Sequence, residues 1–221
     1  MTQPLLRLFE DVLAGPATAP MALPALPRVI YVVQGAAIIG GKRFAADEAW
    51  QGEDAVMLAA ADEGTTCWRW ELGRAGFTVT VAAAPGMTTR EKLSALLTTL
   101  PKGELLMRCD SVSLPAGAVA YAHTHHGPGI RCVIDGGIRV VIHGLSNVYG
   151  PGCAWFEAGP DPVYGEASPH EDSRFIRVTI LPLALAGQRS TTYVNPEDRD
   201  KAKLQQYKVY ADAPIAFGTG G

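Results

Sequence analysis

The sequence lacks the signatures of several common function classes. Its four cysteines are widely spaced and include no Cys-x-x-Cys pair, which excludes a zinc ribbon and a thioredoxin-type redox motif. The net charge is −3 and no block of Lys and Arg stands out, so neither nucleic-acid binding nor a polybasic membrane patch is expected. A Gly-rich phosphate loop, a Gly-x-Ser-x-Gly elbow and a His-Glu-x-x-His motif are also missing.

Long apolar runs are missing as well. Residues 1–15 (MTQPLLRLFEDVLAG) carry Arg7, Glu10 and Asp11 inside their apolar stretch, which fits neither a signal peptide nor a membrane span. Without a secretory segment, the cysteines are expected to be reduced thiols. We therefore expect a cytoplasmic protein with no membrane contact.

What the chain does have is many turn residues between β-branched runs. It holds 24 Gly and 16 Pro in 221 residues, and 48% of its residues are hydrophobic, which is a globular composition. Alternating or β-branched segments predict strands over residues 28–39, 55–60, 65–72, 77–83, 104–114, 119–125, 130–134, 137–142, 154–157 and 175–181. This pattern predicts an all-β protein, with Cys132 as a small buried residue of a central strand.

Three segments instead show helical signals. The apolar residues of Leu5–Leu13 recur at helical spacing before Gly15. Leu93, Leu96, Leu97 and Leu100 do the same within residues 89–100, which predicts a connector helix with a buried leucine face that Pro101 ends. Asn195, followed by Pro196 and two acidic residues, predicts a short helix to about residue 207.

The two halves of the chain are similar to each other. Residues 27–35 (PRVIYVVQG) align without a gap with residues 128–136 (PGIRCVIDG), and residues 52–57 align with residues 152–157. Either Pro and Gly coincide by chance or a β unit is duplicated, and the shared order and spacing favour duplication. We expect an N-terminal half (1–88), the connector helix (89–102), a C-terminal barrel (103–190) and a tail with a short helix (191–221).

The histidines are concentrated in one place. Of five in the chain, three lie in Ala122-His-Thr-His-His126. His123 and His125 point to the same side of a strand because side chains alternate. Two imidazoles on one face are half of a metal site. His126 points to the other face unless the strand ends there and a loop redirects it, whereas His143, beside Gly144, is expected at the surface.

This segment resembles the cupin superfamily. Gly117 stands six residues before His123, and the stretch from His123 to Gly136 has the interval of the first cupin motif. Residues 152–164 (GCAWFEAGPDPVY) occupy the place of the second motif. The first half resembles a second, degenerate unit. The resemblance implies tandem cupin-like jelly-roll barrels with a few short helices, with any site in the C-terminal barrel.

The chain departs from the cupin pattern at two ligands. The carboxylate of the first motif would be expected near residue 129, which is Gly129. The histidine of the second motif would be expected at residues 162–164, where none occurs. The metal ligands that the resemblance leaves are His123 and His125, with Glu157 or His126 as the third. Such a set suits Fe, Mn or Zn, and Ni is a further candidate.

Three residues are candidate substrate contacts. If strand parity continues past residues 127–129, Arg131 shares the face of His123 and favours an anionic ligand, whereas a register shift places it in solvent. Trp155 and Tyr164 lie in the segment that resembles the second motif, and the alternative for Trp155 is a core residue.

Two main functions remain open from the sequence. One is a metal-dependent enzyme of oxygenase, isomerase, decarboxylase or hydrolase type, acting on a small and carboxylate-bearing metabolite. The other is a metal-free small-molecule binding or sensing module. A structural or partner-binding protein is a third possibility. No charge run and no exposed helix stripe in the sequence supports it. Because small barrels expose strand edges, we expect a homo-oligomer, and a dimer in particular.

Overall fold

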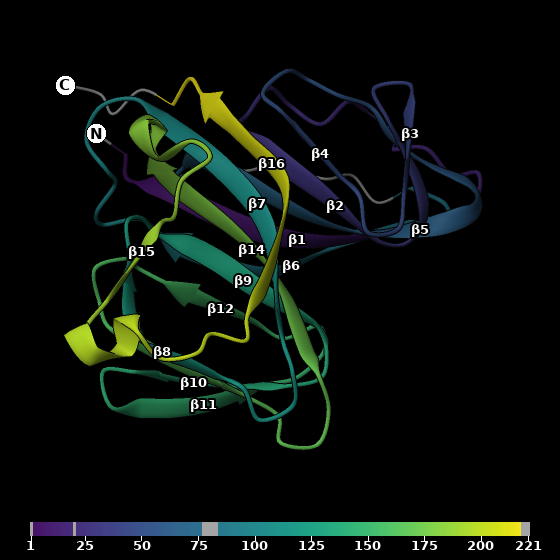
Figure 1. Ribbon diagram of the computed structural model, residues 1–221. Helices are drawn as coiled ribbons and strands as arrows, with labels where there is room; N and C mark the ends of the chain where they lie inside the picture. The colour runs from purple at the N-terminus through teal and green to yellow at the C-terminus, as the bar shows by residue number, and fades with distance from the viewer. Residues whose placement is uncertain (1, 20, 77–83, 218–221) are drawn as a thin grey trace. The chain divides into compact units, whose positions relative to one another are not determined.

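The computed structural model of the protein describes residues 2–19, 21–76 and 84–217 (Figure 1). Strands account for 61% of the chain and helix for 3%, so the predicted all-β class is confirmed. The chain divides into two compact units: unit 1 comprises residues 1–97 and 215–221, and unit 2 comprises residues 98–214. Among the described residues, no helix has the length and hydropathy that a membrane crossing requires.

Unit 1 is a single bent sheet. Its strands are β1 (Pro4–Leu13), β2 (Arg28–Ile39), β3 (Lys42–Ala45), β4 (Ala49–Gly52), β5 (Leu58–Arg74) and β6 (Met87–Leu96). They are ordered β3-β2-β5-β1-β6, and β4 also pairs with β2. The long strands β2 and β5 bend at Gly35, where φ is +71° and a Cβ atom would lie 2.0 Å from the Gly64 carbonyl oxygen. Only glycine fits this bend.

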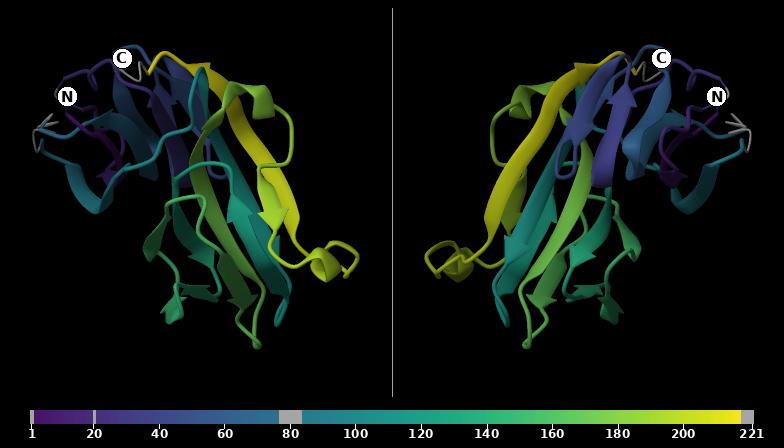
Figure 2. Two further views of the ribbon diagram at one scale, coloured as in Figure 1. Left: turned by 90° about the vertical axis from the view of Figure 1, so that its left-hand side faces the viewer. Right: turned by 90° about the vertical axis from the view of Figure 1, so that its right-hand side faces the viewer.

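Unit 2 is built from two five-stranded sheets, with β16 on an edge (Figure 2). One sheet has the order β11-β10-β13-β8-β15, formed by β8 (Val119–His125), β10 (Ile138–Ile142), β11 (Leu145–Tyr149), β13 (Val163–Ala167) and β15 (Thr191–Tyr193). The other has the order β12-β9-β14-β7-β16, formed by β7 (Leu105–Leu114), β9 (Gly129–Asp135), β12 (Ala154–Glu157), β14 (Ser173–Pro182) and β16 (Gln206–Ile215).

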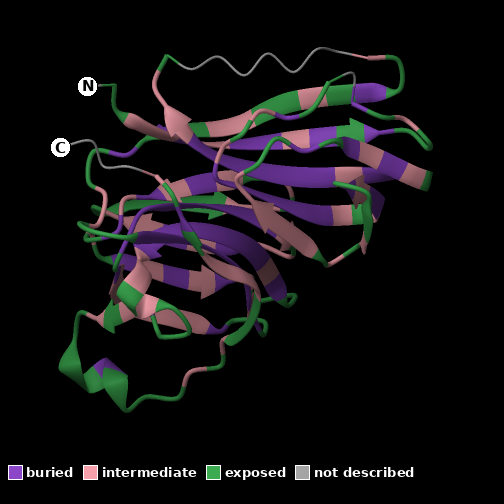
Figure 3. Cartoon of the chain, turned by 90° about the horizontal axis from the view of Figure 1, so that it is seen from above, coloured by how far each residue is buried: buried purple, intermediate pink, exposed green. Residues whose placement is uncertain are grey.

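The core of unit 2 lies between these two sheets. Its apolar cluster takes Val112 and Phe175 from one sheet and Val140 and Val163 from the other. Buried residues follow the strands, and exposed residues gather in the loops and at the short 3₁₀ helix η2 (Pro196–Arg199) (Figure 3). Cys132 is fully buried in β9, as predicted. All four cysteines are free.

The predicted helix over Leu5–Leu13 is wrong, because this segment is strand β1. The strand is paired on both sides, with β5 and with β6. Leu6, Leu8 and Phe9 are all buried, so apolar residues lie on both of its faces. A strand buried on both faces loses the period-two alternation and cannot be told from a short buried helix by spacing alone.

The predicted connector helix is also wrong. Residues 87–96 form β6, which pairs antiparallel with β1. A bulge at Leu8/Phe9 adds one residue to β6, so Leu8 faces Leu93 and Phe9 faces Glu91. The extra residue shifts strand parity and produces spacings that imitate a helix. Leu96 is 47% exposed and Leu97 only 3%, so the leucines do not form one buried face.

The C-terminal segment is mostly extended. The predicted helix exists only as the four residues of η2, and β16 begins at Gln206. A second 3₁₀ turn, η1 (Leu183–Leu185), follows β14. The segment predicted as a tail thus supplies β15 and β16 to the sheets of unit 2. The strand predicted over residues 77–83 lies outside the described residues.

Strand register relates the two units and supports duplication. In unit 1, Trp50 pairs with Ile30, which pairs with Arg69. In unit 2, Trp155 pairs with Arg131, which pairs with Arg177. The alignment of residues 27–35 with residues 128–136 therefore follows the register. The alignment of residues 52–57 with residues 152–157 is wrong, because β4 at 49–52 matches β12 at 154–157.

Candidate functional site in the barrel of unit 2

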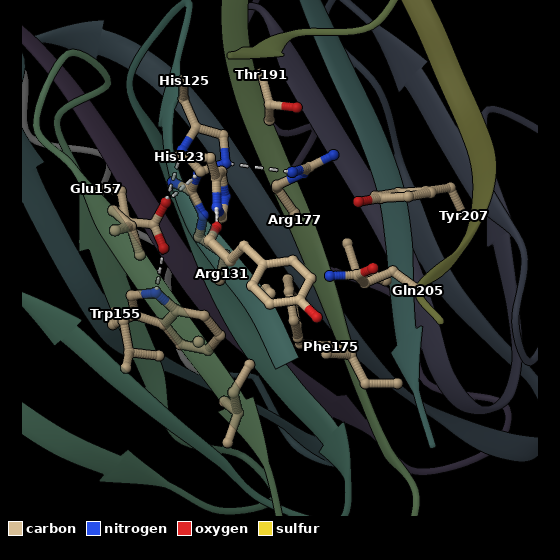
Figure 4. Close-up of a pocket in the computed structure, with 18 of the residues that line it drawn as sticks. His123, His125, Arg131, Trp155, Glu157, Phe175, Arg177, Thr191, Gln205 and Tyr207 are labelled. Carbon is tan, nitrogen blue, oxygen red and sulfur yellow. Dashed lines mark hydrogen bonds and ion pairs between the residues drawn. The ribbon is translucent and has the colours of Figure 1, made fainter. Parts of the chain in front are cut away.

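The candidate site is a pocket between the two sheets of unit 2 (Figure 4). His123 and His125 enter it from β8, and Arg131 enters from β9 in the opposite sheet, so Arg131 faces the interior and not solvent. Trp155 and Glu157 come from β12. Alternation along each strand brings these side chains to one interior, since each pair is two residues apart.

Arg131 and Glu157 form a buried ion pair at the base of this pocket. Arg131 Nη2 lies 2.7 Å from Glu157 Oε2, and the two side chains are 1% and 5% exposed. His125 Nδ1 lies 3.1 Å from the same oxygen. Neither contact has the alignment of a hydrogen bond, so three buried polar atoms converge on one point without closing a bond among the described residues.

The remaining atoms of this pair are anchored by neighbours. Trp155 Nε1 donates to Glu157 Oε1 over 2.8 Å, and Arg131 Nη1 donates to the Gly129 carbonyl oxygen over 2.6 Å. Trp155 is held in turn by stacking on Tyr149, with ring centroids 4.9 Å apart. The pair is therefore part of a hydrogen-bonded polar base with an aromatic support.

Arg177 is the second arginine of the pocket. It lies directly across β14 and β9 from Arg131. The repulsion between the two guanidinium groups is offset because each is paired with a carboxylate. Arg131 is paired with Glu157, and Arg177 Nε and Nη2 donate to Asp110 over 2.8 and 2.7 Å. Burial lowers the pKa of Arg177, but Asp110 more than compensates and the net pKa is raised. Arg177 therefore stays charged, with Nη1 outside the bidentate pair.

The two histidines are neutral and have assigned tautomers. His123 Nδ1 lies 2.7 Å from the Tyr121 carbonyl oxygen, which only accepts, so Nδ1 carries the proton and Nε2 keeps its lone pair. Arg177 Nη1 lies 3.4 Å from His125 Nε2 and donates to it, so the His125 proton sits on Nδ1, facing Glu157. Burial lowers the pKa of His123 and lowers that of His125 further, with the charge of Arg131 adding to the effect at His125.

The predicted metal ligands do not fit a divalent cation in this arrangement. A cation bound to Glu157 would need a distance of about 2.0–2.2 Å to its oxygen. A guanidinium nitrogen already lies 2.7 Å from Oε2, on a side chain that is 1% exposed, and so occupies the place that the cation would need. Of the two histidines, only His123 keeps a ring nitrogen with a lone pair free of a hydrogen bond among the described residues, because Arg177 donates to His125 Nε2. No described group of three His, Cys, Asp or Glu side chains is arranged to hold a metal ion.

The structure brings some predicted site residues together and leaves others out. Trp155 lines the pocket but is only 4% exposed, in contact with Phe175 as part of the core. Tyr164 does not line the pocket, because it alternates with Val163 and Gly165, which do. Its ring lies instead under the guanidinium of Arg139, 5.8 Å away.

The other histidines are also outside the pocket. His126 is exposed and its Nε2 lies 2.9 Å from Thr192 Oγ1, so the loop does not redirect it inward. His143 lies at the surface, as predicted. It has φ of +50° in the turn before β11, and its Nε2 lies 3.3 Å from Asp161 Oδ2.

Sequence reasoning missed Arg177, Gln205 and Tyr207. Arg177 carried a usable signal, a lone arginine inside the apolar strand Phe175–Leu181. Gln205 and Tyr207 had none, because their segment was read as a helix. Figure 4 shows both across the pocket from His123 and Glu157, with Arg177 between the two groups.

The pocket is small and has a larger neighbour. The inner pocket has a volume of about 50 Å³, room for a few waters at about 10–15 Å³ each. An adjoining chamber has a volume of about 420 Å³. The two share six lining residues: Arg177, Arg189, Thr191, Tyr193, Gln205 and Tyr207. We call them the inner pocket and the outer chamber.

No protein-family model matches the chain, and no curated protein is similar to it. Solved structures do match. AerE from Microcystis aeruginosa has a TM-score of 0.58 at 16% identity, over 79% of this chain and 87% of that one. A deletion mutant of Bacillus subtilis oxalate decarboxylase OxdC has a TM-score of 0.59 at 11% identity, over 85% and 71%.

A third match is salicylate 1,2-dioxygenase from Pseudaminobacter salicylatoxidans. Its TM-score is 0.56 at 13% identity, over 94% of this chain and 76% of that one. At these identities the likeness concerns the fold. The chain has the cupin fold in its tandem, all-β form, as the resemblance of residues 117–136 implied.

Proposed function

We propose that unit 2 binds a small organic acid that also carries a hydroxyl group, and that it does so without a resident metal. The protein is then a binding or sensing module of cupin fold. The single observation that carries this proposal is the Arg131 guanidinium on Glu157, which supplies the positive charge that this carboxylate needs.

Complementary groups of the inner pocket support an acid as the ligand. Arg177 Nη1 is a charged donor held in place by Asp110, and a ligand carboxylate is its natural acceptor. His123 Nε2 is an acceptor, so it favours a ligand hydroxyl that donates. A cavity of about 50 Å³ limits the enclosed part of the ligand to a few non-hydrogen atoms.

Apolar walls complete the specificity. Val112, Val140 and Phe175 line the inner pocket around its polar base. A low-dielectric surrounding strengthens the contact to Arg177 and makes an unpaired polar group costly. A ligand that satisfies both Arg177 and His123 is therefore favoured over one that leaves either unpaired.

A titration of chelator-treated protein with glycolate and acetate tests the proposal. Glycolate has the carboxylate and the hydroxyl, whereas acetate lacks the hydroxyl. Glycolate should bind about tenfold more tightly, the effect of about 1.4 kcal/mol from one hydrogen bond. In His123→Ala the preference should disappear, and in the exposed control His170→Ala it should persist. Absence of glycolate binding, or binding only after metal is restored, would contradict the proposal.

A metal-dependent enzyme of oxygenase, isomerase or hydrolase type is the second candidate. The observation that favours it is that His123, His125 and Glu157 line one pocket of this chain, whose fold is similar to that of the oxalate decarboxylase and salicylate dioxygenase structures. It requires Arg131 to leave Glu157. Elemental analysis of untagged protein after reconstitution with Fe, Mn, Zn and Ni separates it from the first candidate.

We further propose a cytoplasmic homodimer. Four free cysteines, three of them buried, support a reducing compartment. Leu145 and Val148 on the edge strand β11 are 69% and 75% exposed, which supports an interface between copies of the chain. The mass in solution, measured by light scattering, tests the dimer.

A further inference from the structure

The outer chamber carries a positive charge that the inner site does not use. Five charged side chains line it: Arg108, Asp110, Arg177, Arg189 and Lys203. Arg177 is neutralised by Asp110, and Arg108 by Asp212, to which it donates from Nε and Nη2 over 3.0 and 2.9 Å. Arg189 and Lys203 are left.

Neither Arg189 nor Lys203 forms an ion pair with a carboxylate among the described residues. Arg189 Nε donates to Thr191 Oγ1 over 2.9 Å, and Lys203 Nζ donates to the Arg199 carbonyl oxygen. Both cations lie by the ring of Tyr193, with Arg189 Cζ 4.5 Å and Lys203 Nζ 5.0 Å from its centroid. Two like charges on one ring repel each other unless an anion lies between them.

Asp198, an acidic side chain whose charge Lys203 also influences, is already occupied. Asp198 accepts from Lys201 Nζ over 2.6 Å and from Asn195 Nδ2 over 3.0 Å. Lys203 contributes to the lowered pKa of Asp198, after the contributions of Lys201 and Asn195. Asp198 does not line the outer chamber, so it does not cancel the charge of Lys203 inside it.

A buried group links this chamber to the inner pocket. Arg177 is more than nine-tenths buried and lines both spaces. Gln205 also lines both, and its Oε1 is buried without a hydrogen-bond partner among the described residues while Nε2 donates to the Val119 carbonyl oxygen. Polar side chains therefore lie where a single ligand would extend from one space into the other.

We infer that the ligand is an elongated organic dianion, with a hydroxy-acid head in the inner pocket and a second carboxylate in the outer chamber between Arg189 and Lys203. This inference rests on the proposed function for the position of the head. The outer chamber, at about 420 Å³, holds the larger part of the molecule. The ring of Tyr193, which both cations approach, lines the same chamber and offers an apolar surface to the chain of the ligand.

Two acids of equal chain length test the second carboxylate. 2-Hydroxyglutarate has it and 2-hydroxypentanoate does not. By calorimetry at low ionic strength, 2-hydroxyglutarate should bind at least about tenfold more tightly, because its second carboxylate forms charged hydrogen bonds that the other acid lacks. In the double variant Arg189→Met/Lys203→Met the preference should vanish, and in the exposed control Lys102→Met it should remain.

The outcomes separate this inference from the proposed function. Equal binding of the two acids to the wild type, a preference that survives in the double variant, or no binding of either acid would overturn the inference. If 2-hydroxyglutarate binds through Arg189 and Lys203 while glycolate does not bind, the outer site stands and the proposed head contacts are wrong. Arg189 is exposed and Lys203 half-buried, so the double variant should fold.

Discussion

Arg131 and Glu157 form their buried ion pair at two register positions that unit 1 fills with Ile30 and Gly52. Arg131 pairs with Trp155 and Ile30 pairs with Trp50, while Glu157 and Gly52 end the strands that carry these tryptophans. The flanking arginine is present in both units, as Arg177 and Arg69. The ion pair is thus one feature, beside the histidines, that distinguishes the candidate site from its counterpart.

Breaking the Arg131–Glu157 pair from one side should be costly. In Arg131→Met the Glu157 carboxylate stays buried without its cation, and the free energy of unfolding should fall by about 3–5 kcal/mol. The double variant Arg131→Met/Glu157→Gln removes both charges and should recover most of the loss. Denaturant unfolding of the four proteins of this cycle measures the coupling. Additive losses would mean that the two side chains do not interact.

Removing Arg131 should also open a cation site that the wild type excludes. Arg131→Ala leaves His123, His125 and Glu157 around an emptied volume, and these are ligand types that Co²⁺ and Zn²⁺ accept. We expect Co²⁺ to raise the melting temperature of Arg131→Ala and to leave that of the wild type unchanged. The variant Arg131→Ala/Glu157→Gln is the control. An equal Co²⁺ effect on the wild type would show that Arg131 does not exclude metal.

His125 should make stability depend on pH in a defined direction. Its folded-state pKa is well below 6.5, its unfolded value, because burial and then Arg131 disfavour the charged ring. The unfolded chain therefore binds the extra proton, and the free energy of unfolding falls as the pH drops below about 6.5. His125→Gln should flatten this dependence, whereas the exposed His170→Gln should not. An unchanged slope in His125→Gln would contradict the assigned neutral form.

Leu96, the last residue of β6, and Leu97, which follows it, should respond differently to truncation. Leu97 is 3% exposed, so Leu97→Ala should lower the free energy of unfolding by about 2–5 kcal/mol. Leu96, 47% exposed, should lose less than about 0.5 kcal/mol. Denaturant unfolding of Leu97→Ala and Leu96→Ala compares them directly. Equal losses of unfolding free energy would mean that both leucines are buried, as the predicted helix requires, and would contradict the strand.

Sequence patterns predicted the strands of unit 2 better than those of unit 1. Val119–His125 and Ala154–Glu157 are strands with the predicted bounds, because turn residues bracket them and one face is apolar. β1 and β6 were missed because double burial and a bulge each removed the alternation that identifies a strand.

The site was predictable only where strand parity decides it. Parity predicted that His123, His125 and Arg131 share one face, and the pocket contains all three, although they reach it from two facing sheets. Parity could not show that Arg131 pairs with Glu157. That contact joins strands β9 and β12, and no local sequence pattern specifies which residues of these two strands lie opposite each other. Tyr207 and Arg189 enter the site from segments whose positions depend on long-range packing.

The metal content of the purified protein tests the central claim most directly. Untagged protein, incubated with Fe, Mn, Zn and Ni and then freed of loosely bound ions, is analysed for each element. Because the Arg131 guanidinium already neutralises the charge of Glu157, the metal found should be far below one ion per chain, and glycolate binding should be the same before and after reconstitution. One ion per chain that is lost in His123→Ala would contradict the account.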